Sequence, residues 1–247
     1  MKRLSPVLLL LFFLLQFTTE ITAQKKRRDY ISDRERFSAG VLIGYNSSQI
    51  DGDYFAGFDK FGITGGIRGI VRLTPRIDFN VEMLYSEKGS KIEQGRILTG
   101  TNQEKSRILD LKYMDAPFSF RYLLNDKPNS WHLELGAIYS RLINSEVTER
   151  ETDRPNQFFY RDILEDFRKD DISTLLGLGH TWQMGLSVNF RYIFSISKFY
   201  KDDDFMESAP NVPRTEAVPF LRNYYYSLGL SYTIFKRKIK KKKGRRR

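Results

Sequence analysis

The chain has 247 residues, a net charge of +11 and no cysteine, so disulfides, thiolate nucleophiles and thiolate metal sites are excluded. Without its first 23 residues the chain carries +10, and the ten basic residues of segment 236–247 account for all of that charge. The high pI is therefore a property of a tail, which argues against a nucleic-acid-binding surface on the folded body.

The beginning of the chain has the features of a secretory signal peptide. Lys2 and Arg3 precede an apolar run over residues 7–15, and the segment ends in Ile-Thr-Ala23. Because a membrane-spanning helix needs roughly 20 apolar residues, a transmembrane anchor is the weaker alternative. We expect residues 1–23 to be removed, which leaves a short periplasmic segment, residues 24–35, before the first strand.

Eight segments show the alternation of apolar and polar residues that is typical of β-strands. In Ile77–Tyr85 every second residue is apolar, while Asp78, Asn80 and Glu82 lie on the opposite face. A soluble barrel would rarely line its core with such charges, whereas a membrane barrel turns its apolar face to lipid. The pattern predicts an all-β protein, an eight-stranded antiparallel up-and-down transmembrane β-barrel over residues 36–235 that is closed and filled by side chains. The expected strands are Arg36–Ser48, Phe61–Leu73, Ile77–Gly89, Leu109–Leu124, Trp131–Asn144, Ile172–Thr181, Gly185–Ser197 and Arg222–Phe235.

The connections between these strands alternate in length. The short ones are Thr74–Arg76, Asn125–Ser130 and the segment around Gln183. The long ones cover residues 49–60, 90–108, 145–171 and 198–221. Short periplasmic turns and long external loops are typical of bacterial barrels, and an even number of strands places both termini in the periplasm. We therefore expect a multi-pass protein of the Gram-negative outer membrane, surrounded by outer-membrane lipid.

One strand departs from simple alternation. Simple alternation is seen, for example, in residues 186–194, where the even positions are apolar throughout and are expected to face lipid. In the fourth strand, by contrast, Leu111 and Tyr113 share one parity, while the apolar residues of 116–122 share the other. We expect a β-bulge near Met114 to reconcile the two halves of that strand.

The lumen of an eight-stranded barrel is just wide enough for side chains to fill it. We therefore expect a packed network of inward charges rather than a diffusion pore, with a proton or ion path as the functional alternative. Arginines and carboxylates in this network would neutralise each other, which offsets the cost of burying them. The expected members are Arg68, Arg72, Asp78, Glu82, Asp115, Arg121, Glu134 and Arg191.

Catalytic and metal chemistry have little support in the sequence. Both histidines, His132 and His180, are expected at the periplasmic end, whereas enzymes that edit lipid A work near the outer leaflet. The acidic segments Asp51–Asp53 and Lys201–Asp204 lack the full spacing of a known calcium loop. We expect no catalytic residue, no cofactor and no metal site, and hence no enzymatic activity.

Candidate contacts with partners lie in one external loop and in the tail. The aromatic residues at 158–160 precede segment 162–169, which is expected to form an aromatic patch or short helix where a partner docks, or a loop folded over the barrel's own rim. The basic tail, residues 236–247, is expected to contact anionic lipid, peptidoglycan carboxylates or an acidic protein, or to be a disordered solubilising end. The residues expected to make these contacts are Phe158, Phe159, Tyr160, Lys240, Lys241, Lys242 and Lys243.

Three blocks of sequence resemble those of a known family. Asp51–Gly62 leading into Gly65–Gly66, then Glu82–Ser90, then Tyr113–Pro117, are similar to the PorT-type outer-membrane β-barrel family of Bacteroidetes, and the similarity runs from about Phe37 to Phe235. The resemblance implies an eight-stranded barrel in the outer membrane. Because the family is named after a member required for protein secretion by the type IX system, it also implies a structural or accessory role in an envelope or secretion assembly. The alternative is a surface binding or adhesion protein that acts through its long extracellular loops.

Overall fold

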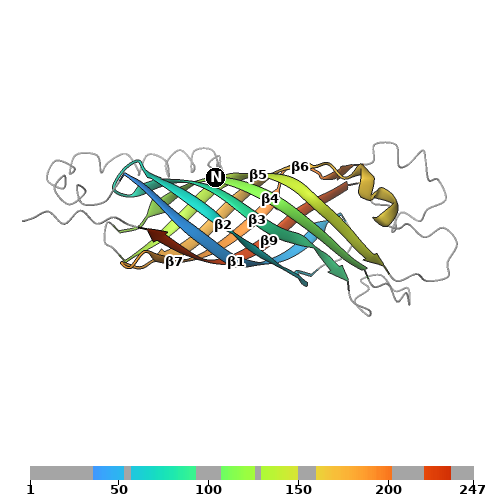
Figure 1. Ribbon diagram of the computed structural model, residues 1–247, viewed down its shortest axis with the longest axis horizontal. Coiled ribbons are helices and arrows are strands. Elements are labelled where there is room, and N and C mark those ends of the chain that lie inside the picture. The colour runs from blue at the N-terminus through green and yellow to red at the C-terminus, as the bar shows by residue number, and fades with distance from the viewer. Residues whose placement is uncertain are drawn as a thin grey trace, which may run out of the picture. The chain divides into compact units, whose positions relative to one another are not determined.

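The strands wrap around a common axis to form a barrel (Figure 1). The computed structural model describes residues 36–52, 57–92, 107–125, 129–149, 160–201 and 220–234. Eight long strands pair antiparallel in chain order, and pairing of the first with the last completes the ring, which confirms the predicted fold. These strands are β1 (Phe37–Asp51), β2 (Lys60–Arg72), β3 (Ile77–Ile92), β4 (Arg107–Leu123), β5 (Ser130–Glu149), β6 (Asp170–Thr181), β7 (Leu186–Ser195) and β9 (Phe220–Ile234).

The hydrogen-bond register determines the stagger of the strands. A path that steps from each residue to the one opposite it on the next strand leaves β2 at Arg72. After one full turn of the ring it returns to β2 at Gly62, ten residues away. Over eight strands, this stagger corresponds to a tilt of about 40° and to an interior that side chains fill. Inward residues that oppose each other on neighbouring strands therefore follow a spiral around the lumen.

The periplasmic turns are as short as the sequence predicts. In the turn between β6 and β7, the Trp182 N–H donates to the Leu186 carbonyl at 2.8 Å, and the Gly185 N–H donates to the Trp182 carbonyl at 3.0 Å. Gly185 has a φ of 92°, a conformation that glycine adopts without steric cost. The chain thus reverses within a few residues.

A bulge does lie close to Met114, but it is not in β4, where the sequence predicts it. β4 keeps one parity along its whole length, so that Leu111 and Tyr113 are buried inside the barrel. The extra residue belongs to the neighbouring strand: the register between β4 and β5 shifts at Lys112, and Ile143 of β5 is left without an opposite residue.

The apolar residues of β4 change parity because the polarity of the barrel wall inverts along its axis. Toward the periplasm, outward residues such as Phe118 are apolar and inward ones such as Arg121 are polar. Beyond Met114 toward the outside, the inward Leu111 is apolar and the outward Lys112 is charged. An apolar outer wall suits lipid and a polar one suits water. The strand therefore leaves the hydrocarbon near Met114 and continues into water.

All of the long strands except β7 reach further at their external ends than predicted. β3 continues to Ile92 and β5 to Glu149, past the expected ends at Gly89 and Asn144, while β4 already begins at Arg107. Together they form a three-stranded extension of the barrel wall (Figure 1). The predicted ends fall short because the lipid-facing alternation stops where the wall leaves the membrane.

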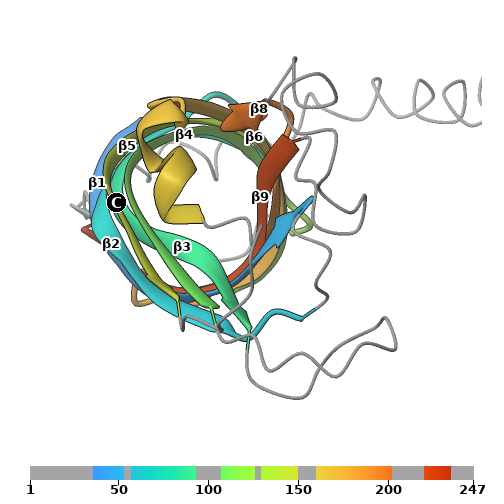
Figure 2. The same ribbon diagram turned by 90° about the vertical axis from the view of Figure 1, so that its right-hand side faces the viewer.

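An apolar core fills the external half of the barrel. The 3-10 helix η4 (Tyr160–Asp166) lies within the ring of strands when viewed along the barrel axis (Figure 2). Of the two alternatives for segment 162–169, the structure has the one in which it folds over the barrel's own rim, because Ile163 and Phe167 pack into this core. The short strand β8 (Tyr200–Lys201), paired with β9, adds to the same core. Its buried members are Ile50, Leu109, Leu111, Tyr113, Ile163, Phe167, Phe199, Tyr200 and Leu221.

Residues 36–235 form a compact unit. The predicted signal peptide (1–23), the segment 24–35 and the basic tail (236–247) lie outside the described residues and stay predictions. No helix among the described residues is long and apolar enough to cross a bilayer.

Candidate functional site

A row of alternating charges follows the register spiral in the periplasmic half of the lumen. Each member opposes the next on the neighbouring strand, and an inward glycine of β6 interrupts the row once. Opposite charges that face each other across strands stabilise the sheet. In register order, from β2 to β7, the row is Arg72, Asp78, Arg121, Glu134, Gly177 and Arg191.

Arg191 braces the lumen from one side to the other. Its Nε and Nη2 donate to the two carboxylate oxygens of Glu134 on β5, at 3.0 and 2.8 Å. Its Nη1 and Nη2 also donate to the carboxylate of Glu82 at 2.8 Å, and β3, which carries Glu82, lies opposite β7 in the ring. All three residues are at most 5% exposed. The guanidinium and its two carboxylates therefore close this level of the lumen.

Further donors complete the hydrogen bonding of the two glutamates. Arg68 Nε donates to Glu82 at 2.6 Å, and Ser119 Oγ donates to Glu134 at 2.6 Å. The inward Gly177 makes room for this cluster, because a Cβ there would lie 3.1 Å from the Glu134 Cβ and 3.4 Å from the Arg191 Cγ. Burying charges in this way is tolerated since every carboxylate oxygen has a donor.

Arg121 is held differently from the other arginines. Its only side-chain hydrogen bond among the described residues runs from Nη2 to the Asn189 Oδ1, at 3.3 Å. The same Asn189 oxygen lies 3.1 Å from the His132 Nε2, and His132 is fully buried. A buried cation thus depends on an amide and on the nearby Glu134 charge rather than on an ion pair of its own.

Asp115 belongs to a second cluster, whose cation was not among the predicted residues. Lys88 is fully buried, and its Nζ lies 2.9 Å from the Asp115 Oδ1. The same Nζ lies 4.5 Å from the ring centroid of Tyr113 and 4.9 Å from that of Tyr225, distances at which cation–π attraction adds to the ion pair. Lys88 shares the inward parity of Glu82, so the alternation of β3 contained the signal, but its place beside a predicted loop obscured it.

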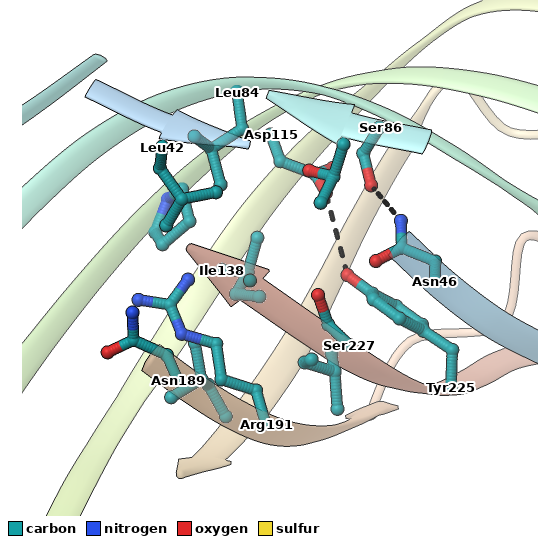
Figure 3. A pocket seen from close by; sticks show the side chains of 15 residues that line it. Leu42, Asn46, Leu84, Ser86, Asp115, Ile138, Asn189, Arg191, Tyr225 and Ser227 are labelled. Atoms are coloured by element: carbon teal, nitrogen blue, oxygen red, sulfur yellow. Dashed lines mark hydrogen bonds between the residues drawn. The ribbon is translucent and has the colours of Figure 1, made fainter. Parts of the chain in front are cut away.

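A small cavity separates the two clusters (Figure 3). Its volume is about 20 Å³, and Asn46, Asp115, Arg191 and Tyr225 are among the residues that line it. The Tyr225 hydroxyl donates to the Asp115 Oδ2 at 3.5 Å, and the Asn46 amide donates to Ser86 at 2.9 Å. A cavity of this size holds about one water molecule. The Arg191 cluster lies on the periplasmic side of this cavity, and the Lys88 cluster and the apolar core lie on its external side.

The outer wall carries aromatic residues at both membrane boundaries. Near the periplasm, His180 faces outward between Trp131 and Trp182, with ring centroids 5.0 and 4.8 Å away. Toward the outside, the rings of Tyr192 and Tyr226 lie 5.1 Å apart. Such girdles are where the amphipathic rings of membrane proteins meet the headgroups, which places the half-exposed apolar wall between them in lipid.

The predicted partner-contact residues fall where the structure describes no side chains. Among the residues that the structure describes, no group of three or more His, Asp or Glu side chains is placed to hold a metal ion. Phe158, Phe159 and the lysines of 240–243 lie outside the described residues, and Tyr160 is described only in its backbone.

Comparison with known proteins supports the same architecture. The family model for the outer membrane protein β-barrel domain matches residues 22–201. The chain belongs to this family. It is therefore an outer-membrane barrel with a lipid-facing wall. β9 lies beyond the matched residues, although it is the strand that closes the ring.

The chain is similar to several solved outer-membrane proteins. Ail of Yersinia pestis, solved with the heparin analogue sucrose octasulfate, is 13% identical with a TM-score of 0.40, over 81% of this chain and all of its own. Neisserial surface protein A is 12% identical with a TM-score of 0.41, over 80% of this chain and 97% of its own. OprG of Pseudomonas aeruginosa is 10% identical with a TM-score of 0.40, over 80% of this chain and 94% of its own. No curated protein matches the sequence.

Proposed function

We propose that this protein is a non-enzymatic, non-conducting barrel that serves as a structural or accessory component of an envelope assembly, most specifically a type IX-like protein-secretion assembly. The observation that carries this proposal is the filled lumen. Arg191 spans it at one level, and an apolar core occupies its external half. A barrel without a passage acts through its rims, its wall and its termini.

The secretory part of the proposal is supported by the three sequence blocks that resemble the PorT-type family of Bacteroidetes. The basic tail, residues 236–247, follows the last strand and would lie in the periplasm. Anionic lipid attracts each lysine or arginine near its surface by about 1 kcal/mol. The tail would therefore hold the periplasmic rim against the inner leaflet, with peptidoglycan carboxylates or an acidic protein as other anionic contacts.

Gentle detergent extraction from native outer membranes tests the proposal. Size analysis and mass spectrometry of the extracted protein are expected to find a stable set of envelope or secretion proteins. A variant that lacks residues 236–247 is expected to lose some of these partners or to impair secretion. Recovery of the barrel without co-purifying proteins, together with normal secretion in cells that lack the protein, would contradict the proposal.

A surface binding or adhesion protein is the second candidate. It is favoured by the extension of β3, β4 and β5, whose outer wall is polar and projects beyond the lipid-facing part of the barrel. Deletion of the tail discriminates between the candidates, because binding by the external end would be unchanged. An unchanged lipid A mass spectrum on overexpression would separately remove a lipid-modifying activity.

A further inference from the structure

Among the described residues, one edge of the external extension has no neighbouring strand. β6 pairs with β5 only as far as the opposition of Asp170 and Arg141. Beyond this point β5 continues to Glu149 and pairs with β4 on one side alone. Residues 143–148 of β5, which we call the β5 edge, have no strand on their other side within the described part of the chain. Unpaired edges of this kind are templates for an added strand.

The backbone donors of the β5 edge can be assigned to its open side. The Leu142 N–H donates to the Lys169 carbonyl at 2.6 Å, away from β4. In an extended strand, residues whose side chains share a face direct their N–H groups to the same side. Val147 faces inward like Leu142, and Ser145 has the parity of Val147. The N–H groups of Ser145 and Val147 therefore point to the open side.

The inner face beside the edge is apolar and incompletely covered. Leu142 and Val147 of β5, with Leu164 of η4, pack against the apolar core but are only partly buried. A strand laid along the β5 edge would cover these three side chains. Burial of apolar area is the main favourable term when such a strand is added.

The outer face beside the edge carries an exposed carboxylate. The Glu146 side chain is 61% exposed, although Lys112 lies 3.3 Å away. Hydrogen bonds from Lys112 and Asn144 lower the pKa of Glu146, which lies beyond the lipid-facing part of β5, so the carboxylate is ionised at neutral pH. A basic side chain on an added strand would be attracted to it.

A second copy of the chain fits this edge poorly. Antiparallel pairing of two identical edges needs a two-fold axis perpendicular to the sheet. In a barrel wall that axis lies in the plane of the membrane, so one of the two copies would be inverted. Two Glu146 carboxylates would also approach each other, which disfavours the pairing.

We propose that the β5 edge binds an extended segment of a partner polypeptide by β-strand addition, with apolar side chains facing inward over Leu142, Val147 and Leu164 and a basic side chain facing outward near Glu146. This goes beyond the proposed function, because it names where a partner chain attaches. It is compatible with either candidate function, since an assembly component and a surface binder both need such an attachment.

Hydrogen exchange of the full-length protein in lipid nanodiscs tests the inference. The probe is a synthetic peptide of alternating valine and lysine. In the free protein, the amides of Ser145 and Val147 are expected to exchange readily, and the peptide is expected to protect them. Ser145→Pro removes a donor at the open side and is expected to weaken peptide binding about tenfold, whereas Ser145→Ala keeps the donor and binds like the parent.

Several results would overturn the inference. Protection of these amides in the free monomer would mean that the chain covers its own edge, and protection that depends on protein concentration would mean pairing between copies. If the peptide binds Ser145→Pro as tightly as the parent, strand addition is ruled out. If a peptide of alternating valine and glutamate binds as tightly as the lysine peptide, the charge preference is ruled out. Assembly proteins that co-purify with Ser145→Pro as well as with the parent would leave the proposed function standing and remove this attachment site.

Discussion

Replacing Glu134 by glutamine tests whether the lumen network stabilises the barrel. Glu134 is 4% exposed and accepts hydrogen bonds from Arg191 at 2.8 and 3.0 Å and from Ser119 at 2.6 Å. Glutamine keeps the volume but removes the charge, so that Arg191 retains only Glu82 and Arg121 has no carboxylate opposite it except Asp78, which already pairs with Arg72. Breaking one side of a buried ion pair costs about 3–5 kcal/mol.

Urea unfolding in lipid vesicles, followed by tryptophan fluorescence, measures this loss. With a slope of about 2 kcal/mol per molar, Glu134→Gln is expected to lower the midpoint by about 2 M. The matched control is Glu146→Gln, whose exposed ion pair contributes about 1 kcal/mol or less. Adding Arg121→Gln to Glu134→Gln removes the unpaired cation and is expected to recover about 1–2 kcal/mol. Equal midpoints for Glu134→Gln and Glu146→Gln would refute the reasoning.

Three further predictions follow from the geometry of the wall and lumen. Gly177→Val is expected to cost about 1–3 kcal/mol of stability in the same assay, because its Cβ would lie 3.2 Å from a Glu134 carboxylate oxygen. Gly69→Val is the control, because the one atom near its Cβ is the Val81 carbonyl oxygen, 3.8 Å away. Leu135→Arg on the lipid face is expected to cost about 2–4 kcal/mol of stability. Thr148→Arg on the water-facing extension is expected to cost less than about 0.5 kcal/mol. Equal costs would show that the polarity of the wall does not invert. The full-length protein in planar bilayers is expected to give no steady current, and a stable open-channel current would contradict the filled lumen.

The strands and their faces could be predicted because lipid and lumen make opposite demands on alternate residues. In β7 the even positions from Leu186 to Phe194 alternate with inward residues such as Arg191, as predicted. A shift of one residue would place Arg191 in hydrocarbon, which makes the register evident from the sequence. The short turns followed from the same periodicity, since little sequence remains between the strands.

The members of the candidate site could be predicted better than their contacts. Parity alone places Glu82 and Arg191 inside the barrel. Which of them meet depends on the curvature and stagger of the closed sheet, because Arg191 reaches Glu82 across the lumen rather than along it. The same holds for Lys88, which pairs with Asp115 on the neighbouring strand and lies close to the ring of Tyr225 from β9.

The sequence by itself determined which residues share a face, because alternation in a strand is a property of the backbone. The strand count and most of the inward charges follow from the same alternation. Only the tertiary structure decided what each face meets. The change of parity between Tyr113 and Ala116 reads equally well as a bulge or as a strand that leaves the membrane. The structure shows the second, because η4 and β8 supply an apolar core inside the barrel where water replaces lipid outside it.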